Sequence, residues 1–547
     1  MATTRDMSSK YKNTILKSVL ISSGPPPVYQ LNPKKKMFGT LTKMTVGEKN
    51  PKKTNKTILL VGETGAGKST LINALVNYTM GVTWEDGVWF QIVEEEKKSQ
   101  SKSQTSDVIV YEIFGFEDET LPYSLTIIDT PGYGDTRGTE HDVIVSERLL
   151  DLFRSDDGVQ EVHAVGLVMK ASDNRLSDRL RYIFDSVISL FGKNLEKNIV
   201  ALITHSDGVT PENALEALEA AKIKCARIED EPVCFLFNNQ QEKERKKKDK
   251  VGLHNAWRVS EGGMSEFSEF LENIEPQKLM TTVEVLNERI RLTACIQNLQ
   301  ERIDFIELKQ TEIKQTQEAL KKHEEKMTTN KEFTIEIDEV YKVREDIEVG
   351  WWCLLAGYAG AVSCKVCEEN CHYPGCTMAW YPAHCEVMKG GRCTFCTNKC
   401  PASDHVKERK IYVTKTRRVK KTNEEMKNKY DKNKTESEDK SSLLENLEKE
   451  MNQLRAEKSQ WLEESYQHVV RLEEIALNVF SLSTIVHLEL LSEKMKEKGD
   501  TEKVQKLEEM RSRVDEGTRG ALQYIPAVMK KFGQTLWNKM KTHQTDM

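Results

Sequence analysis

A glycine-rich stretch between an apolar run and an amphipathic segment constrains this chain more than any other feature of the sequence. Residues 58–61 are all apolar and predict a buried strand, and residues 71–75 predict the helix that follows. Between them, residues 62–70 read Gly-Glu-Thr-Gly-Ala-Gly-Lys-Ser-Thr. Glycines at this spacing let successive backbone N–H groups turn toward one point at the start of a helix, where they hold phosphate oxygens. The sequence therefore predicts a P-loop rather than a glycine-rich turn that binds nothing.

The residues of this loop have distinct expected roles. Lys68 is expected to reach the β- and γ-phosphates of a nucleotide, and the hydroxyl of Ser69 is expected to bind Mg²⁺. The other contacts between the loop and the nucleotide are expected from Glu63, Thr64, Gly65, Ala66, Gly67 and Thr70.

A second apolar run, residues 125–128, predicts another buried strand, which leads into Asp-Thr-Pro-Gly at residues 129–132. A carboxylate at the end of a strand beside a P-loop is placed to hold Mg²⁺, so Asp129 is a candidate metal group. The N–H of Gly132 is expected to contact the γ-phosphate. Thr105 is the candidate hydroxyl that completes the magnesium shell, although a solvated Ser/Thr-rich loop explains this residue equally well. The candidate catalytic groups are therefore Lys68, Thr105 and Gly132.

Two further predicted strands end in residues that suit a purine base. Residues 198–203 lead into Thr-His-Ser-Asp at residues 204–207. The carboxylate of Asp207 can accept hydrogen bonds from N1 and N2 of guanine, which adenine does not offer, and this favours GTP over ATP. Asn238 follows the predicted strand at 233–237 and is placed to flank the base.

Apolar strands alternate with amphipathic helices over residues 55–275. This pattern predicts an α/β fold, a P-loop G domain with a mostly parallel sheet and helices on both faces. Residues 1–54 contain Gly-Pro-Pro-Pro and a run of three lysines, so they are expected to form a mostly irregular arm. The net charge of −6 gives no general case for nucleic-acid binding.

The ends of the sequence bear on location. The N-terminus has no apolar signal segment, so a reducing, cytoplasmic compartment is expected. Ala2 excludes myristoylation and the last residues offer no cysteine for prenylation, so no lipid anchor is expected. Any membrane contact would then come from a partner or from surface residues.

Two long segments in the second half of the chain carry apolar residues at heptad spacing. The first covers residues 276–330 and the second covers residues 423–498. Neither helix can bury its apolar stripe alone, so the two are expected to pair as a long antiparallel coiled-coil hairpin. A helical tail is expected over residues 499–547.

Residues 331–422, between these helices, predict a β-ribbon that carries a small cysteine-rich tip. The chain has twelve cysteines, and nine of them lie between Cys353 and Cys400. The spacing Cys-x2-Cys-x3-Cys occurs twice, and paired thiolates two residues apart can hold one tetrahedral ion. We therefore expect two structural Zn²⁺ ions and no catalytic zinc, with a reduced cysteine cluster as the alternative. The candidate zinc ligands are Cys364, Cys367, Cys371, His372, Cys376, Cys385, Cys393, Cys396, Cys400 and His405.

The motifs of the first half together resemble a known family. Residues 56–275 look like AIG1-type (immune-associated) G domains and, slightly less closely, like septins. The resemblance rests on the P-loop, the turn at 129–135, the Thr-His-Ser-Asp motif and the Phe-Asn-Asn segment at 237–239. It implies binding of GTP or GDP with Mg²⁺ and face-to-face pairing of two G domains. It also implies that Thr204 and His205 belong to the nucleotide site, although a surface histidine remains an alternative.

One departure from Ras-like GTPases bears on activity. The residue after Gly132 is Tyr133, where Ras-like proteins have a glutamine that positions water. Hydrolysis is therefore expected to be slow, or to depend on a residue from a partner protomer. The long helices with their cysteine-rich segment also resemble the hairpins of fish and invertebrate AIG1-like proteins.

The expected function is a guanine-nucleotide switch that hydrolyses GTP slowly and dimerises through its G domain. The alternative is a septin-like scaffold that keeps GTP or GDP bound and assembles through its coiled coil. A protein partner is expected at the coiled coil or at the tip. Nucleic-acid binding by the tip is a third interpretation, and it is not the expected one.

Overall fold

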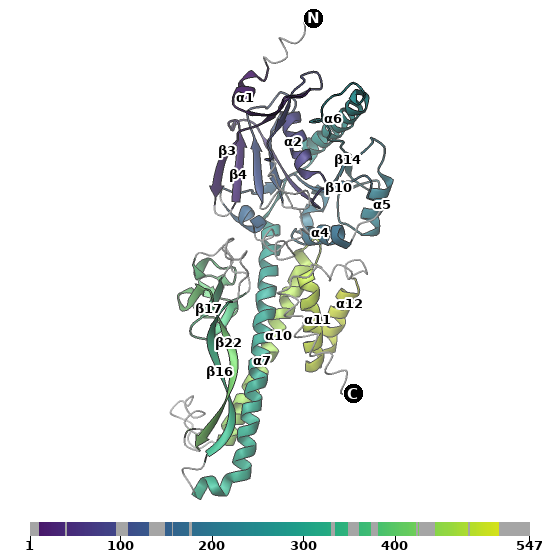
Figure 1. The fold of residues 1–547 in the computed structure, drawn as a ribbon. Coiled ribbons are helices and arrows are strands. Elements are labelled where there is room, and N and C mark those ends of the chain that lie inside the picture. The colour runs from purple at the N-terminus through teal and green to yellow at the C-terminus, as the bar shows by residue number, and fades with distance from the viewer. Residues whose placement is uncertain are drawn as a thin grey trace, which may run out of the picture. The chain divides into compact units, whose positions relative to one another are not determined.

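The strand before the predicted P-loop, β5 (Asn55–Gly62), lies near the middle of an eight-stranded sheet in the computed structural model. Figure 1 labels β3, β4, β10 and β14 of this sheet. The structure describes residues 10–38, 41–94, 108–130, 148–155, 157–173, 178–329, 334–347, 360–373, 381–422, 425, 443–479 and 482–513. The chain divides into two compact units. The first comprises Met1–Leu286, Glu473–Ile485 and Ser512–Met547, and the second comprises Asn287–Leu472 and Val486–Arg511.

The large sheet belongs to the first unit and has the strand order β14-β11-β10-β5-β8-β7-β4-β3. β5 pairs in parallel with β8 on one side and with β10 on the other. β7 runs antiparallel to β8, and β3 runs antiparallel to β4. The predicted mostly parallel sheet is therefore confirmed. In sheet order the strands are Cys234–Leu236, Ile199–Thr204, Ala164–Lys170, Asn55–Gly62, Ser124–Asp129, Ile109–Ile113, Leu41–Val46 and Lys34–Phe38.

Helices cover both faces of this sheet because the central strands are apolar on both sides. α2 (Lys68–Thr79) and α6 (Lys250–Asn273) pack in one apolar cluster with Ile58 and Leu60 of β5. Leu59, which lies between Ile58 and Leu60 in β5, points to the opposite face of the sheet, and α4 (Asp178–Ile188) also contacts β5. The smaller elements of this unit are β9 (Glu161–Val162), η1 (Lys193–Asn198), α5 (Glu212–Ala220), β12 (Arg227–Ile228), β13 (Glu231–Pro232) and β15 (Gln277–Lys278).

The N-terminal region differs from the irregular arm expected over residues 1–54. It contains α1 (Lys12–Leu16), β1 (Val19–Ser22) and β2 (Val28–Gln30), and its strands β3 and β4 extend the large sheet. β2 pairs in parallel with β6 (Trp89–Gln91). Three consecutive lysines in β3 read as a solvated run in the sequence. Lysine is, however, a favoured residue on an edge strand, and β3 is the edge of the sheet.

α7 (Met280–Thr329) and α10 (Leu443–Ile475), most of whose residues belong to the second unit, run antiparallel to each other. The Sγ of Cys295 lies 3.1 Å from the hydroxyl oxygen of Ser465. Further along α7, Ile313 packs with Leu447 and Met451, near the opposite end of α10. Contacts therefore join early residues of one helix to late residues of the other.

The single returning helix expected over residues 423–498 is wrong, because α10 ends at Ile475 and α11 (Leu482–Lys498) is a separate helix. The segment between them pairs with another part of the chain. Leu477 donates its N–H to the carbonyl of Phe191, at a donor–acceptor distance of 2.8 Å. Backbone groups used in this way cannot continue the helical ladder. α12 (Thr501–Ser512) lies in the predicted tail, of which the structure describes residues 499–513.

β16 (Thr334–Asp346) and β22 (Lys410–Thr422) form a long antiparallel ribbon. The ribbon runs back along α7, since the N–H of Val340 donates to a carboxylate oxygen of Glu312 at 3.1 Å (Figure 1). The cysteine-rich segment consequently lies beside residues 294–302 of α7 and not at the far end of a hairpin. The predicted tip position is wrong. Alternate residues in the first half of β16 are buried, and burial of that face favours packing on the helix over projection into solvent.

The cysteine-rich segment has little regular structure of its own. A three-stranded sheet of order β18-β17-β21 carries part of it. The elements of the segment are β17 (Ala361–Cys364), β18 (Glu369–His372), η2 (Pro382–His384), β19 (Met388–Lys389), β20 (Arg392–Cys393), η3 (Ala402–Asp404) and β21 (His405–Glu408).

No helix in the described part of the chain is both long and apolar enough to cross a membrane.

Candidate nucleotide site and candidate metal centre

The loop between β5 and α2 has the backbone shape of an anion-binding loop. Gly65 and Gly67 have φ angles of +83° and +94°, in the left-handed region that glycine adopts most readily. A Cβ atom at Gly67 would also lie 3.3 Å from the Cγ2 of Thr204. No side chain caps α2 at Gly67, so its first N–H groups are not satisfied by a capping residue. The loop therefore directs backbone donors and the positive end of a helix dipole toward one place.

Lys68 is buried in this loop, with 7% of its surface exposed. Its Nζ donates to the carbonyl oxygen of Gly62 at 2.7 Å and to that of Glu63 at 3.2 Å. Burial lowers the pKa of Lys68, whereas the charges of Asp129 and Glu63 raise it. Asp129 is fully buried at the end of β8, where it pairs with Leu60 of β5. The structure thus brings the predicted phosphate-binding lysine and the predicted magnesium carboxylate to the same end of two neighbouring strands.

The side chains of the loop fit a polar ligand. The hydroxyl of Thr64 is buried and has no hydrogen-bond partner among the described residues. An unsatisfied buried hydroxyl costs about 1–3 kcal/mol, which a phosphate oxygen would relieve. Ser69 lies in the first turn of α2, directly after Lys68. The predicted switch residues Thr105 and Gly132 lie outside the described residues.

The base motif is tied to the P-loop through Thr204, the last residue of β11. Its hydroxyl donates to the carbonyl oxygen of Ala66 at 2.7 Å. The Nδ1 of His205 lies 3.1 Å from the same hydroxyl oxygen. Partial burial lowers the pKa of His205, and the charges of Lys170 and Lys243 lower it further. A neutral imidazole beside the P-loop is therefore expected at pH 7.

Asn238 contacts the backbone of Ser206, the residue that directly precedes Asp207. The side-chain N–H of Asn238 donates to the carbonyl oxygen of Ser206 at 2.7 Å. Asp207 is exposed, and one of its carboxylate oxygens accepts the N–H of Val209 at 3.0 Å. The hydroxyl of Ser260 accepts the N–H of Asn238 at 2.9 Å. Ser206 lay within the predicted motif without a role, and Ser260 on α6 had no signal in the sequence.

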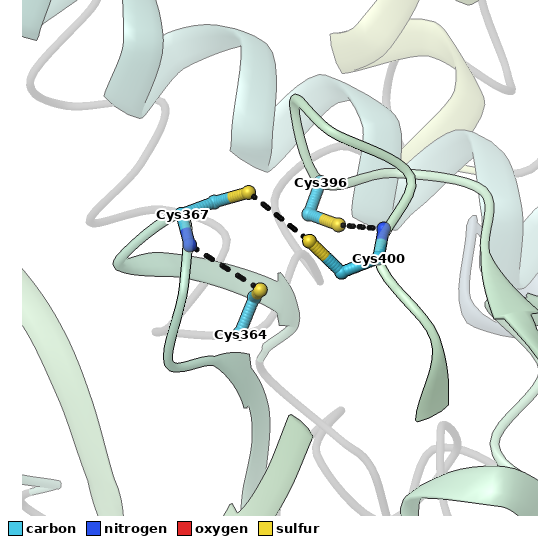
Figure 2. Close-up of side chains that lie close together, drawn as sticks. All are labelled: Cys364, Cys367, Cys396 and Cys400. Atoms are coloured by element: carbon cyan, nitrogen blue, oxygen red, sulfur yellow. Dashed lines mark hydrogen bonds between the residues drawn. The ribbon is translucent and has the colours of Figure 1, made fainter. Parts of the chain in front are cut away.

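The cysteine-rich segment contains two groups of four residues whose ligand atoms lie within 4.8 Å of one another. The Sγ atoms of Cys367 and Cys400 are 3.7 Å apart (Figure 2). Two thiolates bound to one tetrahedral zinc at about 2.3 Å each lie about 3.8 Å apart, so the separation fits an ion. Cys396 belongs to both groups. The first group is Cys364, Cys367, Cys396 and Cys400, and the second is Cys371, Cys393, Cys396 and His405.

Backbone N–H groups point at the sulfur atoms of these groups. Cys367 donates its N–H to the Sγ of Cys364 at 3.4 Å, and Cys400 donates to the Sγ of Cys396 at 3.1 Å. Cys396 likewise donates to the Sγ of Cys393 at 3.3 Å. Such hydrogen bonds favour the thiolate form that binds metal.

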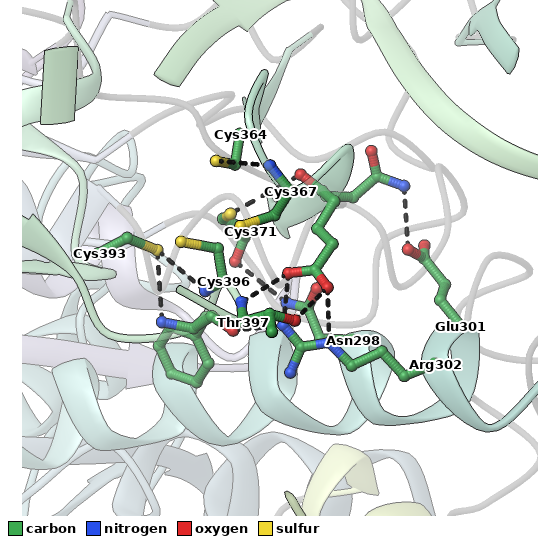
Figure 3. A network of polar contacts seen from close by, with 12 residues as sticks. Asn298, Glu301, Arg302, Cys364, Cys367, Cys371, Cys393, Cys396 and Thr397 are labelled. Carbon is green, nitrogen blue, oxygen red and sulfur yellow. Dashed lines mark hydrogen bonds and ion pairs between the residues drawn. The ribbon is translucent and has the colours of Figure 1, made fainter. Parts of the chain in front are cut away.

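α7 supplies polar support for the cysteine loops (Figure 3). Arg302 donates to the carbonyl oxygen of Phe395 at 2.6 Å. Lys342 of the ribbon donates to the carbonyl oxygen of Glu368 at 2.8 Å, and Lys399 also donates to a carbonyl of this segment. Two of these cationic side chains also form ion pairs, Arg302 with Glu369 at 2.6 Å and Lys399 with Glu464 at 3.2 Å.

The ten predicted zinc ligands do not act as one set. Seven of them form the two groups that share Cys396, which we call the seven-residue cluster. His372 and Cys385 instead form a third group with Glu386, a residue that the sequence did not single out. The position of Glu386 directly after Cys385 is the feature of the sequence that could have indicated it as a ligand. Cys376 lies outside the described residues.

Comparison with known proteins matches part of the first unit to a known family. A family model described as the AIG1 family matches residues 56–254. The neuronal-specific septin-3 of Danio rerio is 29% identical over 202 residues, which cover 33% of this chain and 53% of that protein. The Homo sapiens neuronal-specific septin-3 is 28% identical over 208 residues, covering 35% and 55%. The chain thus spans about half the length of the curated relatives it matches.

Solved structures also match. Toc33 from Arabidopsis thaliana, in a crystal structure with GDP and Mg²⁺, has 16% sequence identity and a TM-score of 0.27. That match covers 43% of this chain and 84% of the Toc33 chain. The resemblance predicted over residues 56–275 is confirmed over the part that the family model matches. Residues 56–254 are an AIG1-type, septin-like G domain.

Proposed function

We propose that this chain is a guanine-nucleotide-binding protein that hydrolyses GTP slowly and dimerises through its G domain. The observation that carries the proposal is the loop between β5 and α2. Lys68 is buried at the start of α2, and the Thr64 hydroxyl has no hydrogen-bond partner among the described residues. The match of residues 56–254 to the AIG1 family supports guanine as the base.

The residues of this chain would divide the work of holding the nucleotide. The loop amides and Lys68 would bind the phosphates, and Ser69 with Asp129 would hold Mg²⁺. Mg²⁺ would neutralise charge on the phosphate oxygens. The carboxylate of Asp207 would accept hydrogen bonds from N1 and N2 of guanine, while His205 and Asn238 would flank the base.

The choice of base gives a direct test of the site. Asp207→Asn is expected to weaken GTP binding by roughly 10- to 150-fold, because a charged hydrogen bond to guanine contributes about 1.5–3 kcal/mol. The affinity for ATP is expected to stay unchanged, since adenine lacks the N1 and N2 donors through which guanine would bind Asp207. Displacement of a fluorescent GTP analogue by GTP and by ATP measures both. Asp230→Asn, on an exposed turn of the same domain, is the matched control. Equal loss of both nucleotides would show that Asp207 does not select the base.

A septin-like scaffold is the second candidate, favoured by the similarity to septin-3 and by the long helices α7 and α10. In this alternative the nucleotide stays bound and the helices, acting as a hairpin, carry assembly or a protein partner. The two candidates differ in turnover.

For the switch, GTP hydrolysed per chain per minute is expected to rise several-fold across a concentration series, because a dimer partner completes the site. Phosphate release at several protein concentrations measures this, with Lys68→Ala as the blank for contaminating enzymes. Bound nucleotide that never exchanges, with no hydrolysis at any concentration, would favour the scaffold.

We also propose that the seven-residue cluster holds two structural zinc ions, with Cys396 as a ligand of both. The supporting observations are the 3.7 Å sulfur separation, the N–H groups directed at sulfur and the buried state of most of these cysteines. A segment with so little regular structure needs metal to fold. Metal-bound thiolates persist where thiols stay reduced, which supports the cytoplasm as the proposed location.

A further inference from the structure

We propose a third metal site, formed by His372, Cys385 and Glu386. It extends the metal-binding segment proposed above and uses none of the seven ligands of that cluster. The Nδ1 of His372 lies 3.1 Å from the Sγ of Cys385 and 3.6 Å from a carboxylate oxygen of Glu386. All three ligand atoms lie within 4.8 Å of one another. One nitrogen, one sulfur and one oxygen donor therefore surround a single point.

The geometry distinguishes a metal site from a catalytic triad. In a triad of nucleophile, histidine and carboxylate, the two partners bind opposite nitrogens of the imidazole ring. Here the thiol of Cys385 and the carboxylate of Glu386 both approach the Nδ1 of His372. A ring oriented in this way cannot pass a proton from one partner to the other through its two nitrogens. Convergence on one nitrogen is the arrangement of ligands around an ion.

Burial and charge support the same conclusion. The side chains of His372 and Glu386 are 8% and 7% exposed, and Cys385 is 2% exposed. A thiolate and a carboxylate buried this deeply need positive charge close by. A divalent ion held by one thiolate, one carboxylate and one neutral imidazole is electrically balanced. The mixture of nitrogen, sulfur and oxygen donors suits Zn²⁺ better than Ca²⁺ or Mg²⁺, which prefer oxygen alone.

The local structure holds the three ligands from two separate places. His372 is the last residue of β18, whereas Cys385 and Glu386 follow η2. The Nε of Arg291, on α7, donates to the carbonyl oxygen of Glu386 at 3.5 Å. An ion at this site would join β18 to the loop after η2. Three protein ligands from the described residues leave one position of a tetrahedral ion for water or another ligand, so this ion should exchange faster than those of the cluster.

The test is the metal content of the full-length protein, measured by mass spectrometry after purification in zinc. Glu386→Gln keeps the size of the side chain and removes its charge, so it is expected to hold about one zinc ion fewer than the wild type. His372→Ala is expected to lose the same ion. His384→Ala, at an exposed histidine next to Cys385 in the sequence, is the matched control and is expected to keep the wild-type content. Cobalt in place of zinc gives a second readout, because the difference spectrum between wild type and Glu386→Gln should show the absorption of one thiolate bound to cobalt.

The difference in metal content between the wild type and Glu386→Gln decides the proposal, whatever the total number of ions that the wild type holds. Equal metal content and equal cobalt spectra would overturn the third site and leave the seven-residue cluster untouched. If the metal contents and spectra are equal and Cys385 is also alkylated rapidly, Cys385 and His372 form a hydrogen-bonded thiol–imidazole pair instead of a metal site. A wild type that holds a single ion, which Glu386→Gln lacks, would support the third site and contradict the proposed cluster.

Discussion

Replacement of Lys68 by alanine is expected to weaken GTP binding roughly 150-fold. The Nζ of Lys68 donates to the carbonyl oxygens of Gly62 and Glu63, so the ammonium is already held at the loop that would receive the phosphates. Burial lowers its pKa, and a phosphate group would reverse that effect by supplying negative charge. Loss of charge-assisted hydrogen bonds worth about 3 kcal/mol predicts a roughly 150-fold higher Kd for GTP.

The experiment needs to separate binding from folding, because Lys68 is buried. Lys68→Met keeps the length of the side chain and removes only its charge, and it is expected to lose GTP affinity as alanine does. Lys224→Ala, at an exposed position of the same domain, should bind as the wild type does. Titration calorimetry gives the Kd values, and thermal unfolding without nucleotide shows whether the variants fold. Unchanged affinity in a folded Lys68→Met protein would contradict the assignment of the loop.

This loop could be predicted from sequence because its chemistry is local. Phosphate binding needs glycines, a lysine and a hydroxyl at short, fixed spacing between a strand and a helix, and all lie within residues 62–70. Asp129 could be predicted because a strand end next to the loop follows from the parallel order of the sheet. The contact of Thr204 with Ala66 joins residues far apart in the chain, and no local pattern encodes it.

The N-terminal strands show why some of the fold could not be predicted. β3 contains three lysines in a row, and a pattern of this kind carries no alternation of apolar and polar residues. Whether such a segment is a strand depends on the edge that another strand offers it, here β4, which itself pairs with β7. Pairing partners of this kind are tertiary information.

The metal ligands lie between these two cases. The cysteines could be predicted as ligands because their short spacings match the geometry of one ion. Their grouping could not, since it depends on how the loops fold back beside α7. Glu386 is a common surface residue by type, and only the structure places its carboxylate beside the imidazole of His372. The sharing of Cys396 by two groups is likewise a property of the folded segment.

Replacement of Cys396 by serine is expected to remove both zinc ions of the seven-residue cluster. Cys396 is the one residue among those described that belongs to both groups of four, so its loss leaves each ion with three ligands. Cys364 belongs to one group, and Cys364→Ser is expected to weaken one ion. Structural zinc contributes about 10–16 kcal/mol of binding energy in small zinc-dependent domains, so loss of both ions should unfold the cysteine-rich segment.

The order of the effects is what tests the shared thiolate. Zinc content after dialysis against a mild chelator, compared with the wild type, is expected to fall by about two ions in Cys396→Ser and by about one in Cys364→Ser. Cys234→Ser, in a strand of the G domain outside all three groups, should lose none. Limited proteolysis should then cut the cysteine-rich segment first in Cys396→Ser, while GTP binding by the separate first unit is retained. A loss of one ion in both Cys396→Ser and Cys364→Ser would mean that Cys396 binds only one ion. Removing a thiolate that binds a single ion cannot release two ions.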